Sequence, residues 1–257
     1  MLGLAVVGFH RSGTSMLAGI LHKNGMSMGS DLLGASYSNP YGHFEDKRVI
    51  SINDSILERQ NGRWYNDFAV SSFVDPDSIV DIQNYFEGRC AEEGQFGFKD
   101  PRLMTTLGTW TLAVPELRIL YIHRGFRRSC YSLWLRAYRD LALGRATELN
   151  DIIVRSKEGV VGLYINNVMN FLSLWASDES VRTRTAFIDY DALQAKEVNI
   201  RGVLGGIGID FPDVDLDRYI DPDVISAEGG FQGEIDQDFL ARALSIDTRI
   251  QELCTIK

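Results

Sequence analysis

The sequence lacks several features that mark specialised protein classes. No apolar run approaches the ~20 residues that a membrane-spanning helix needs, and the first residues show neither the basic segment nor the cleavage site of a signal peptide. The cysteines are few and widely spaced, with no CxxC pair: Cys90, Cys130 and Cys254. Such a set is typical of reduced thiols rather than of a disulfide framework or a zinc site. We therefore expect a cytoplasmic protein without a membrane span.

An excess of positive charge is also missing. The formal net charge is −9, which argues against nucleic acid as a partner. The cations are gathered locally, because residues 117–128 hold four arginines and a histidine but no acid, and Arg11, Lys99 and Arg102 lie in glycine- or proline-marked turns. This clustering predicts a site for an anionic small molecule.

The length and composition indicate one large globular domain. The chain has 257 residues, of which 45% are hydrophobic and 24% charged, enough for a well-buried core. It contains no internal repeat, low-complexity tract or flexible linker. We predict a single domain over residues 1–257.

Strand-like and helix-like segments alternate along the chain. Short apolar runs at 4–7, 96–98, 118–122 and 185–188 lack polar alternation and are typical of buried parallel strands. Helices are expected over 14–23, 76–90, 127–143, 149–176 and 237–253. The pattern predicts an α/β protein, a P-loop NTPase-like three-layer fold with a central, mostly parallel sheet flanked by helices. Ligands of such sheets bind outside the carboxyl ends of the strands.

Residues 8–15 have the frame of a phosphate-binding loop. The sequence Gly-Phe-His-Arg-Ser-Gly-Thr-Ser follows the first strand and opens a helix, so that backbone N–H groups can surround a phosphate. A nucleotide triphosphatase has lysine where this chain has Thr14, and here the cation is Arg11, inside the loop. This arrangement suits a donor with a single 5′-phosphate that carries a small transferable group.

The loop resembles the 5′-phosphosulfate-binding loop of the sulfotransferase family, whose bacterial branch reads PRSGT or HRSGT. The resemblance implies that 3′-phosphoadenosine 5′-phosphosulfate (PAPS) is the donor and adenosine 3′,5′-bisphosphate the product. It implies that the loop binds the 5′ end through His10, Arg11, Ser12, Gly13, Thr14 and Ser15. A second segment, 121–133, places Arg124 at a strand end and Ser132 eight residues later, and this pair holds the 3′-phosphate of the donor in sulfotransferases.

Residues 39–46 and 97–102 are similar to the NPxGxFE and KDPR strings of bacterial carbohydrate-type sulfotransferases. The resemblance spans roughly residues 4 to 135, with weaker echoes at 189–193 and 220–223. It implies a hydroxyl or amine acceptor, favouring a carbohydrate or glycoconjugate hydroxyl over a phenol. The chain departs from its relatives at 224–230, which is glycine-containing where they often have an arginine-rich turn.

Sulfuryl transfer requires a nucleophile, a base, and positive charge near the leaving oxygen. We assign Arg11 to the sulfonate and the leaving oxygen, and Lys99, similar to the family's strand-end lysine, as the second cation. Glu45 is the first candidate for the base, since its turn and aromatic neighbour can shield a carboxylate from water. Two alternatives stand: His43 as the base, or Glu45 as a solvent-facing acid at the start of a helix. No metal is required, and His10 is expected to pack or to hydrogen-bond within the loop.

Two other functions compete with this reading. A P-loop kinase or nucleotide hydrolase would need magnesium, a lysine at position 14 and an aspartate at a neighbouring strand end, whereas residues 122–124 read Ile-His-Arg. A non-catalytic nucleotide-binding protein of the same fold is the second alternative. The aromatic residues Trp64 and Tyr65, and those of 131–138, could line an acceptor cleft or belong to the core.

Overall fold

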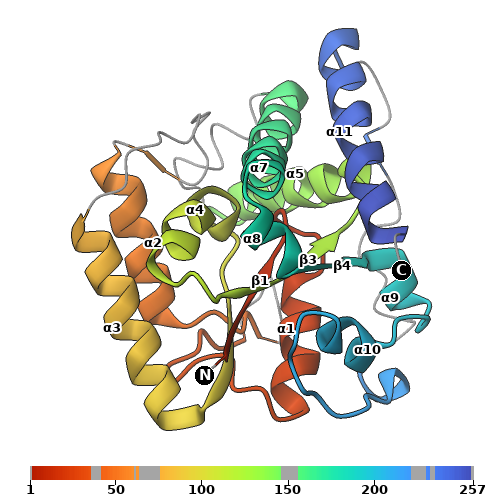
Figure 1. Ribbon diagram of the computed structural model, residues 1–257. Coiled ribbons are helices and arrows are strands. Elements are labelled where there is room, and N and C mark those ends of the chain that lie inside the picture. The colour runs from red at the N-terminus through yellow and green to blue at the C-terminus, as the bar shows by residue number, and fades with distance from the viewer. Residues whose placement is uncertain are drawn as a thin grey trace.

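The computed structural model describes residues 2–35, 42–60, 62–63, 76–145, 156–220, 230–231 and 235–255. Its centre is a parallel sheet with the strand order β2-β1-β3-β4 (Figure 1). The strands are β1 (Leu2–Val7), β2 (Gln95–Lys99), β3 (Arg118–His123) and β4 (Thr185–Asp189). The predicted α/β fold is confirmed, and each of these strands covers an apolar run expected from the sequence.

Five helices correspond to predicted segments: α1 (Thr14–Lys23), α3 (Pro76–Glu93), α5 (Phe126–Ala142), α7 (Lys157–Ser177) and α11 (Gln237–Thr255). The predicted start of α7 at residue 149 was wrong in one respect, because Ser156 is extended and caps the helix by accepting a hydrogen bond from Gly159 N. Residues 149–155 lie outside the described residues.

The structure contains further helices that the pattern did not predict. They are α2 (Lys47–Arg59), α4 (Leu103–Ala113), α8 (Glu179–Thr183), α9 (Tyr190–Gln194), α10 (Ile200–Gly205) and the 3-10 turn η1 (Leu216–Arg218). Of these, α2 and α4 matter most for the site, since they begin within four residues after the candidates Glu45 and Lys99.

Alternate residues of each strand face opposite cores, because successive side chains of a strand point to opposite faces of a sheet. Ala5, Phe98 and Tyr121 belong to the larger core, while Leu4 and Leu120 belong to the smaller one. Figure 1 shows α4 and α7 on one side of the sheet and α1 and α10 on the other. The helices on both sides bury β1, β2 and β3 almost completely, while the edge strand β4 is half-buried.

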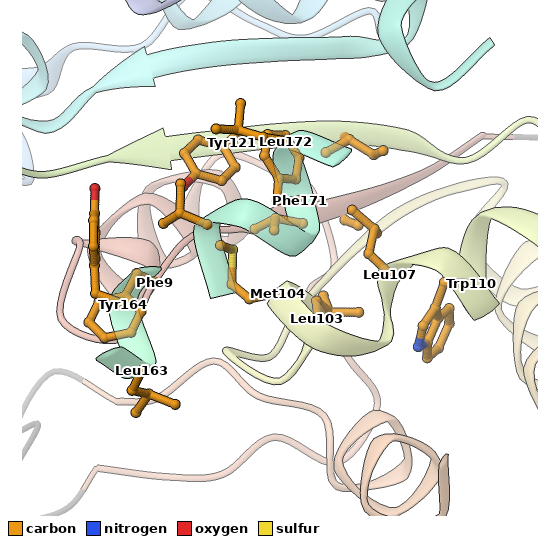
Figure 2. Packing of buried hydrophobic residues seen from close by; sticks show 14 of the residues in the cluster. Phe9, Leu103, Met104, Leu107, Trp110, Tyr121, Leu163, Tyr164, Phe171 and Leu172 are labelled. Carbon is orange, nitrogen blue, oxygen red and sulfur yellow. The ribbon is translucent and has the colours of Figure 1, made fainter. Parts of the chain in front are cut away.

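The larger core is rich in aromatic rings. The ring of Tyr121 stacks on that of Phe171 of α7 at 4.2 Å, and Trp110 of α4 lies 4.6 Å from Phe98. Figure 2 shows α4 and α7 bringing Leu103, Met104 and Leu172 into the same cluster. Phe9, which belongs to the phosphate loop, packs edge-on against Tyr164 of α7. The core therefore reaches directly under the loop.

Candidate active site

The phosphate loop occupies the turn between β1 and α1. Arg11 has a φ of 65° and Gly13 a φ of 96°, so the backbone enters the left-handed region twice within three residues. A Cβ on Gly8 would lie 2.6 Å from the carbonyl oxygen of Ile122 in β3. Only glycine fits this close approach, which curls the chain tightly over the ends of two neighbouring strands.

The loop has the hydrogen-bond donors that an anion requires. The first-turn amides of α1 have no partner within their own helix, and this end of a helix carries partial positive charge. Ser12 is 1% exposed, and its Oγ has no hydrogen-bond partner in the described part of the chain. A buried hydroxyl in this condition costs free energy unless a ligand satisfies it. The loop therefore fits a terminal phosphate group.

Residues far apart in the sequence meet at Arg11. Its Nε donates a hydrogen bond to Ser132 Oγ of α5 at 3.1 Å, and Arg124 Nη1 donates to the carbonyl oxygen of Arg11 at 3.0 Å. The Arg124 guanidinium also lies over the ring of Tyr190, 4.8 Å from its centroid. The structure thus joins the segments after β1, β3 and β4 in one cationic cluster.

A buried ion pair lies beside the loop. Lys99, the last residue of β2, pairs with Glu45 and also donates to Ser15 Oγ at 3.2 Å and to the carbonyl oxygen of His43 at 3.3 Å. Lys99 is 1% exposed and Glu45 8%. The alternative of a solvent-facing Glu45 is therefore wrong: the carboxylate is shielded from water and points to the loop.

Glu45 is held in place by its neighbour Asp46, which is fully buried. Asp46 caps α2 by accepting from Arg48 N at 2.9 Å, and it also accepts from Ser30 N, Tyr85 OH and Arg89 Nη1 at 3.1, 3.3 and 3.4 Å. A buried carboxylate with this many donors has one well-defined position. The segment that carries Glu45 is consequently rigid at this point.

Phe44 fixes the other side of Glu45. It adopts a φ of 53°, unusual for a residue with a side chain. Its ring lies against Gly19 of α1, where a Cβ would be 2.8 Å from the ring. The absence of a side chain at Gly19 makes room for this contact and brings Glu45 toward the helix that begins at the phosphate loop.

Burial and positive charge shift the pKa values of the site. Burial, followed by the charges of Arg136 and Arg124, lowers the pKa of Arg11 to about 10, so it is still a cation at neutral pH. Burial lowers the pKa of His43; Glu45 opposes this shift, and Lys99 and Arg136 add to it. His43 is therefore neutral at pH 7 and could accept a proton. Burial also lowers the pKa of His10 well below its usual value, and its ring packs against Phe9.

The structure brings together Arg11, Ser15, Glu45, Lys99 and Ser132, all of which were candidates from the sequence. Two residues of the site were not predicted from the sequence: Tyr190, whose ring lies under Arg124, and Arg136, whose charge lowers the pKa of both Arg11 and His43. The sequence did contain a signal for each of these residues. Tyr190 comes directly after a strand, and Arg136 comes one helical turn after Ser132. Several predicted segments lie outside the described residues: 39–41, 64–65 and 221–229.

Comparison with known proteins supports the fold. The chain shares the fold of a sulfotransferase from Alicyclobacillus acidocaldarius. The two are 15% identical with a TM-score of 0.51, and the match covers 100% of this chain and 97% of that one. A sulfotransferase domain from the curacin biosynthetic pathway (13% identity, 82% and 76% coverage, TM-score 0.49) is also similar. So is sulfotransferase STF1 from Mycobacterium tuberculosis H37Rv (11%, 99% and 76%, 0.49). No family model and no curated protein matches the sequence.

Two kinds of feature are absent from the described residues. No helix among them is long and apolar enough to cross a bilayer. The same residues contain no group of three or more histidine, cysteine, aspartate or glutamate side chains placed to hold a metal ion.

Proposed function

We propose that this protein is a PAPS-dependent sulfotransferase that transfers a sulfuryl group to a hydroxyl or amine acceptor, in particular a carbohydrate or glycoconjugate hydroxyl. The observation that carries the proposal is the cluster around Arg11. A curled loop with an arginine inside it contacts Ser132 and Arg124, the two residues expected at the 3′-phosphate, and lies beside the Lys99–Glu45 pair. One anionic nucleotide with a phosphate at each end would engage all of these groups.

In the proposed reaction the acceptor oxygen forms a bond to sulfur as the bond from sulfur to the bridging phosphate oxygen breaks. The electron pair of the broken bond stays on the phosphate, and an in-line arrangement keeps the two oxygens on opposite sides of sulfur. Arg11 stabilises the charge that develops on the leaving oxygen, and Lys99 is the second cation. The amides of residues 12–15 and the Ser12 hydroxyl hold the 5′-phosphate, while Arg124 and Ser132 hold the 3′-phosphate.

Glu45 is the proposed base that takes the acceptor's proton. Its burial and the hydrogen bonds of Asp46 give it a fixed position near the loop. The pairing with Lys99 implies that the lysine must turn from Glu45 toward the sulfonate when the donor binds. His43 is the alternative base, since its lowered pKa keeps the imidazole neutral and able to accept a proton at pH 7.

Turnover of Arg11→Ala, Glu45→Gln and His43→Gln with a ³⁵S-labelled donor and an acceptor panel tests these roles. Arg11→Ala should lower turnover roughly 10²–10³-fold while sparing the fold, since it removes charge only where charge develops. The control is Arg201→Ala, an exposed arginine paired with Asp213. Near-full turnover of Glu45→Gln with the true acceptor would remove Glu45 from the base role, and loss in His43→Gln would transfer that role to His43.

Thermal unfolding separates the competing functions. Adenosine 3′,5′-bisphosphate should stabilise the protein without magnesium, by about 2.7 kcal/mol when its free concentration is ~100 times its Kd. Preferential stabilisation by ATP and magnesium would instead favour a kinase or hydrolase. Donor binding with no sulfation of any acceptor would favour a non-catalytic nucleotide-binding protein.

We further propose that residues 1–257 act as one catalytic domain, because the cluster joins segments from position 11 to position 190. A cytoplasmic location is part of the same proposal. Cys90 and Cys130 are buried free thiols, which are typical of proteins in reducing compartments.

A further inference from the structure

The face of α5 that meets the phosphate loop continues with two arginines. Ser132 contacts Arg11 from this face. Arg136 follows Ser132 by four residues and Arg139 by seven, and residues at these spacings lie on the same side of a helix. Both guanidinium groups therefore extend the cationic cluster along α5, beyond the position of Ser132.

The charge of Arg136 acts on the phosphate loop and on the segment that carries His43 and Glu45. After burial, it is the largest influence that lowers the pKa of Arg11, and it also lowers the pKa of His10 and His43. Arg139 acts on Arg11 in the same direction. Since His43 lies two residues from Glu45, Arg136 reaches the side of the site where the proposed acceptor loses its proton.

These two arginines are only partly neutralised. Arg136 Nε lies 3.7 Å from Asp140 Oδ2, and its side chain is 39% exposed. Arg139 is exposed, and no acidic side chain pairs with it in the parts of the chain that the structure describes. Asp140 thus offsets the charge of Arg136 in part, and Arg139 keeps its positive charge on an exposed helix surface open to a ligand.

The proposed donor does not require this charge. Arg11, Lys99 and Arg124 already face its two anionic ends. The positive charge of Arg136 weakens His43 as a base, because a nearby cation disfavours proton uptake. An anion brought by the second substrate would offset this cost.

Resting on the proposed function, we propose that Arg136 and Arg139 bind an anionic group of the acceptor, a carboxylate, sulfate or phosphate near the hydroxyl to be sulfated. Arginine suits this role because its planar fork matches the oxygens of all three groups. The acceptor class is then an acidic sugar or glycoconjugate rather than a neutral one.

Binding measured by calorimetry tests this without requiring transfer. Three probes are titrated in the presence of adenosine 3′,5′-bisphosphate: 4-nitrophenyl β-D-glucuronide, the neutral 4-nitrophenyl β-D-glucoside, and the same glucoside bearing a 6-sulfate. The variants are Arg136→Gln, Arg139→Gln and their combination. Arg201→Gln is the matched control, since it is also a surface arginine with an acidic partner, Asp213, at 3.0 Å.

The wild-type protein should bind one of the two anionic probes at least about tenfold more tightly than the glucoside, the effect of a single charge-assisted hydrogen bond. The glucuronide and the 6-sulfate together tell a carboxylate site from a sulfate site. Arg136→Gln should remove most of that preference, with the Kd of adenosine 3′,5′-bisphosphate changed less than about twofold and Arg201→Gln unchanged.

Equal binding of charged and neutral probes, including no measurable binding of any, would overturn the inference. A preference that survives in the double variant would do the same. Failure of the proposed function gives a different result, since adenosine 3′,5′-bisphosphate itself would then not bind.

Discussion

The buried pair of Lys99 and Glu45 makes a quantitative prediction. Both side chains are almost inaccessible, with 2% of the lysine and 11% of the glutamate side chain exposed. Lys99→Met leaves the Glu45 carboxylate buried without its partner, and breaking a buried pair in this way costs about 3–5 kcal/mol. For a domain of this size, each 1 kcal/mol lowers Tm by about 2–4 °C, so a decrease on the order of 10 °C is expected.

Glu45→Gln should cost less, about 1–3 kcal/mol, because the amide oxygen can still accept a hydrogen bond from Lys99. Ser15 Oγ and the His43 carbonyl oxygen also continue to accept from the ammonium group. The double variant Lys99→Met, Glu45→Gln contains no buried charge at this place. It should therefore be more stable than Lys99→Met alone, although it carries one more substitution.

Urea unfolding followed by tryptophan fluorescence gives the four free energies of the cycle. The control is Lys47→Met with Asp31→Asn, a pair at 2.8 Å whose side chains are 55% and 66% exposed. An exposed pair of this kind should show a coupling below about 1 kcal/mol. Additive effects at Lys99 and Glu45 would show that the two charges are solvated in solution and would refute the buried ion pair.

Two further variants probe the loop. Gly13→Ala should lower the free energy of unfolding more than Gly25→Ala. The two glycines have similar φ values, 96° and 99°. At Gly13 the added Cβ would lie 2.4 Å from the Tyr190 ring, whereas at Gly25 it would meet no atom within 4 Å. Equal losses in urea would exclude that contact. The pKa of His10 is lower in the folded protein than in the unfolded chain. As pH falls below about 6.5, the unfolded chain therefore binds the proton first. The free energy of unfolding then falls by up to about 1.4 kcal/mol per pH unit. His10→Gln should make the free energy of unfolding less dependent on pH between pH 6.5 and 4.5. Parallel curves for the wild-type protein and the variant would contradict this prediction.

The strands were predictable because their central residues are apolar. Residues 4–7 and 119–122 are buried, so the composition of these runs marks them. α1 was predictable for a similar reason, since it follows directly on a loop whose glycines set its start. The helices α2 and α4 were missed because their starting signals lie in motifs interpreted for chemistry: Asp46 caps α2, and the turn at 100–102 opens α4.

Sequence spacing could supply the residue types of the site but not their contacts. Arg11 and Ser132 are 121 residues apart, and only the packing of α5 beside the loop decides that they form a hydrogen bond. The ion pair of Lys99 and Glu45 depends on the burial of Asp46, whose partner Arg89 comes from the C-terminal part of α3. Such contacts follow from tertiary packing, which a single sequence does not reveal.

The contact between Phe44 and Gly19 has a wider consequence. The ring of Phe44, the residue before Glu45, packs against α1, the helix that begins at the phosphate loop. The phosphate loop and the segment that carries Glu45 are thus both positioned by α1, and a small movement of this helix would shift them together. A substitution at Gly19 would therefore change the spacing between the phosphate loop and Glu45 without altering a residue of either segment.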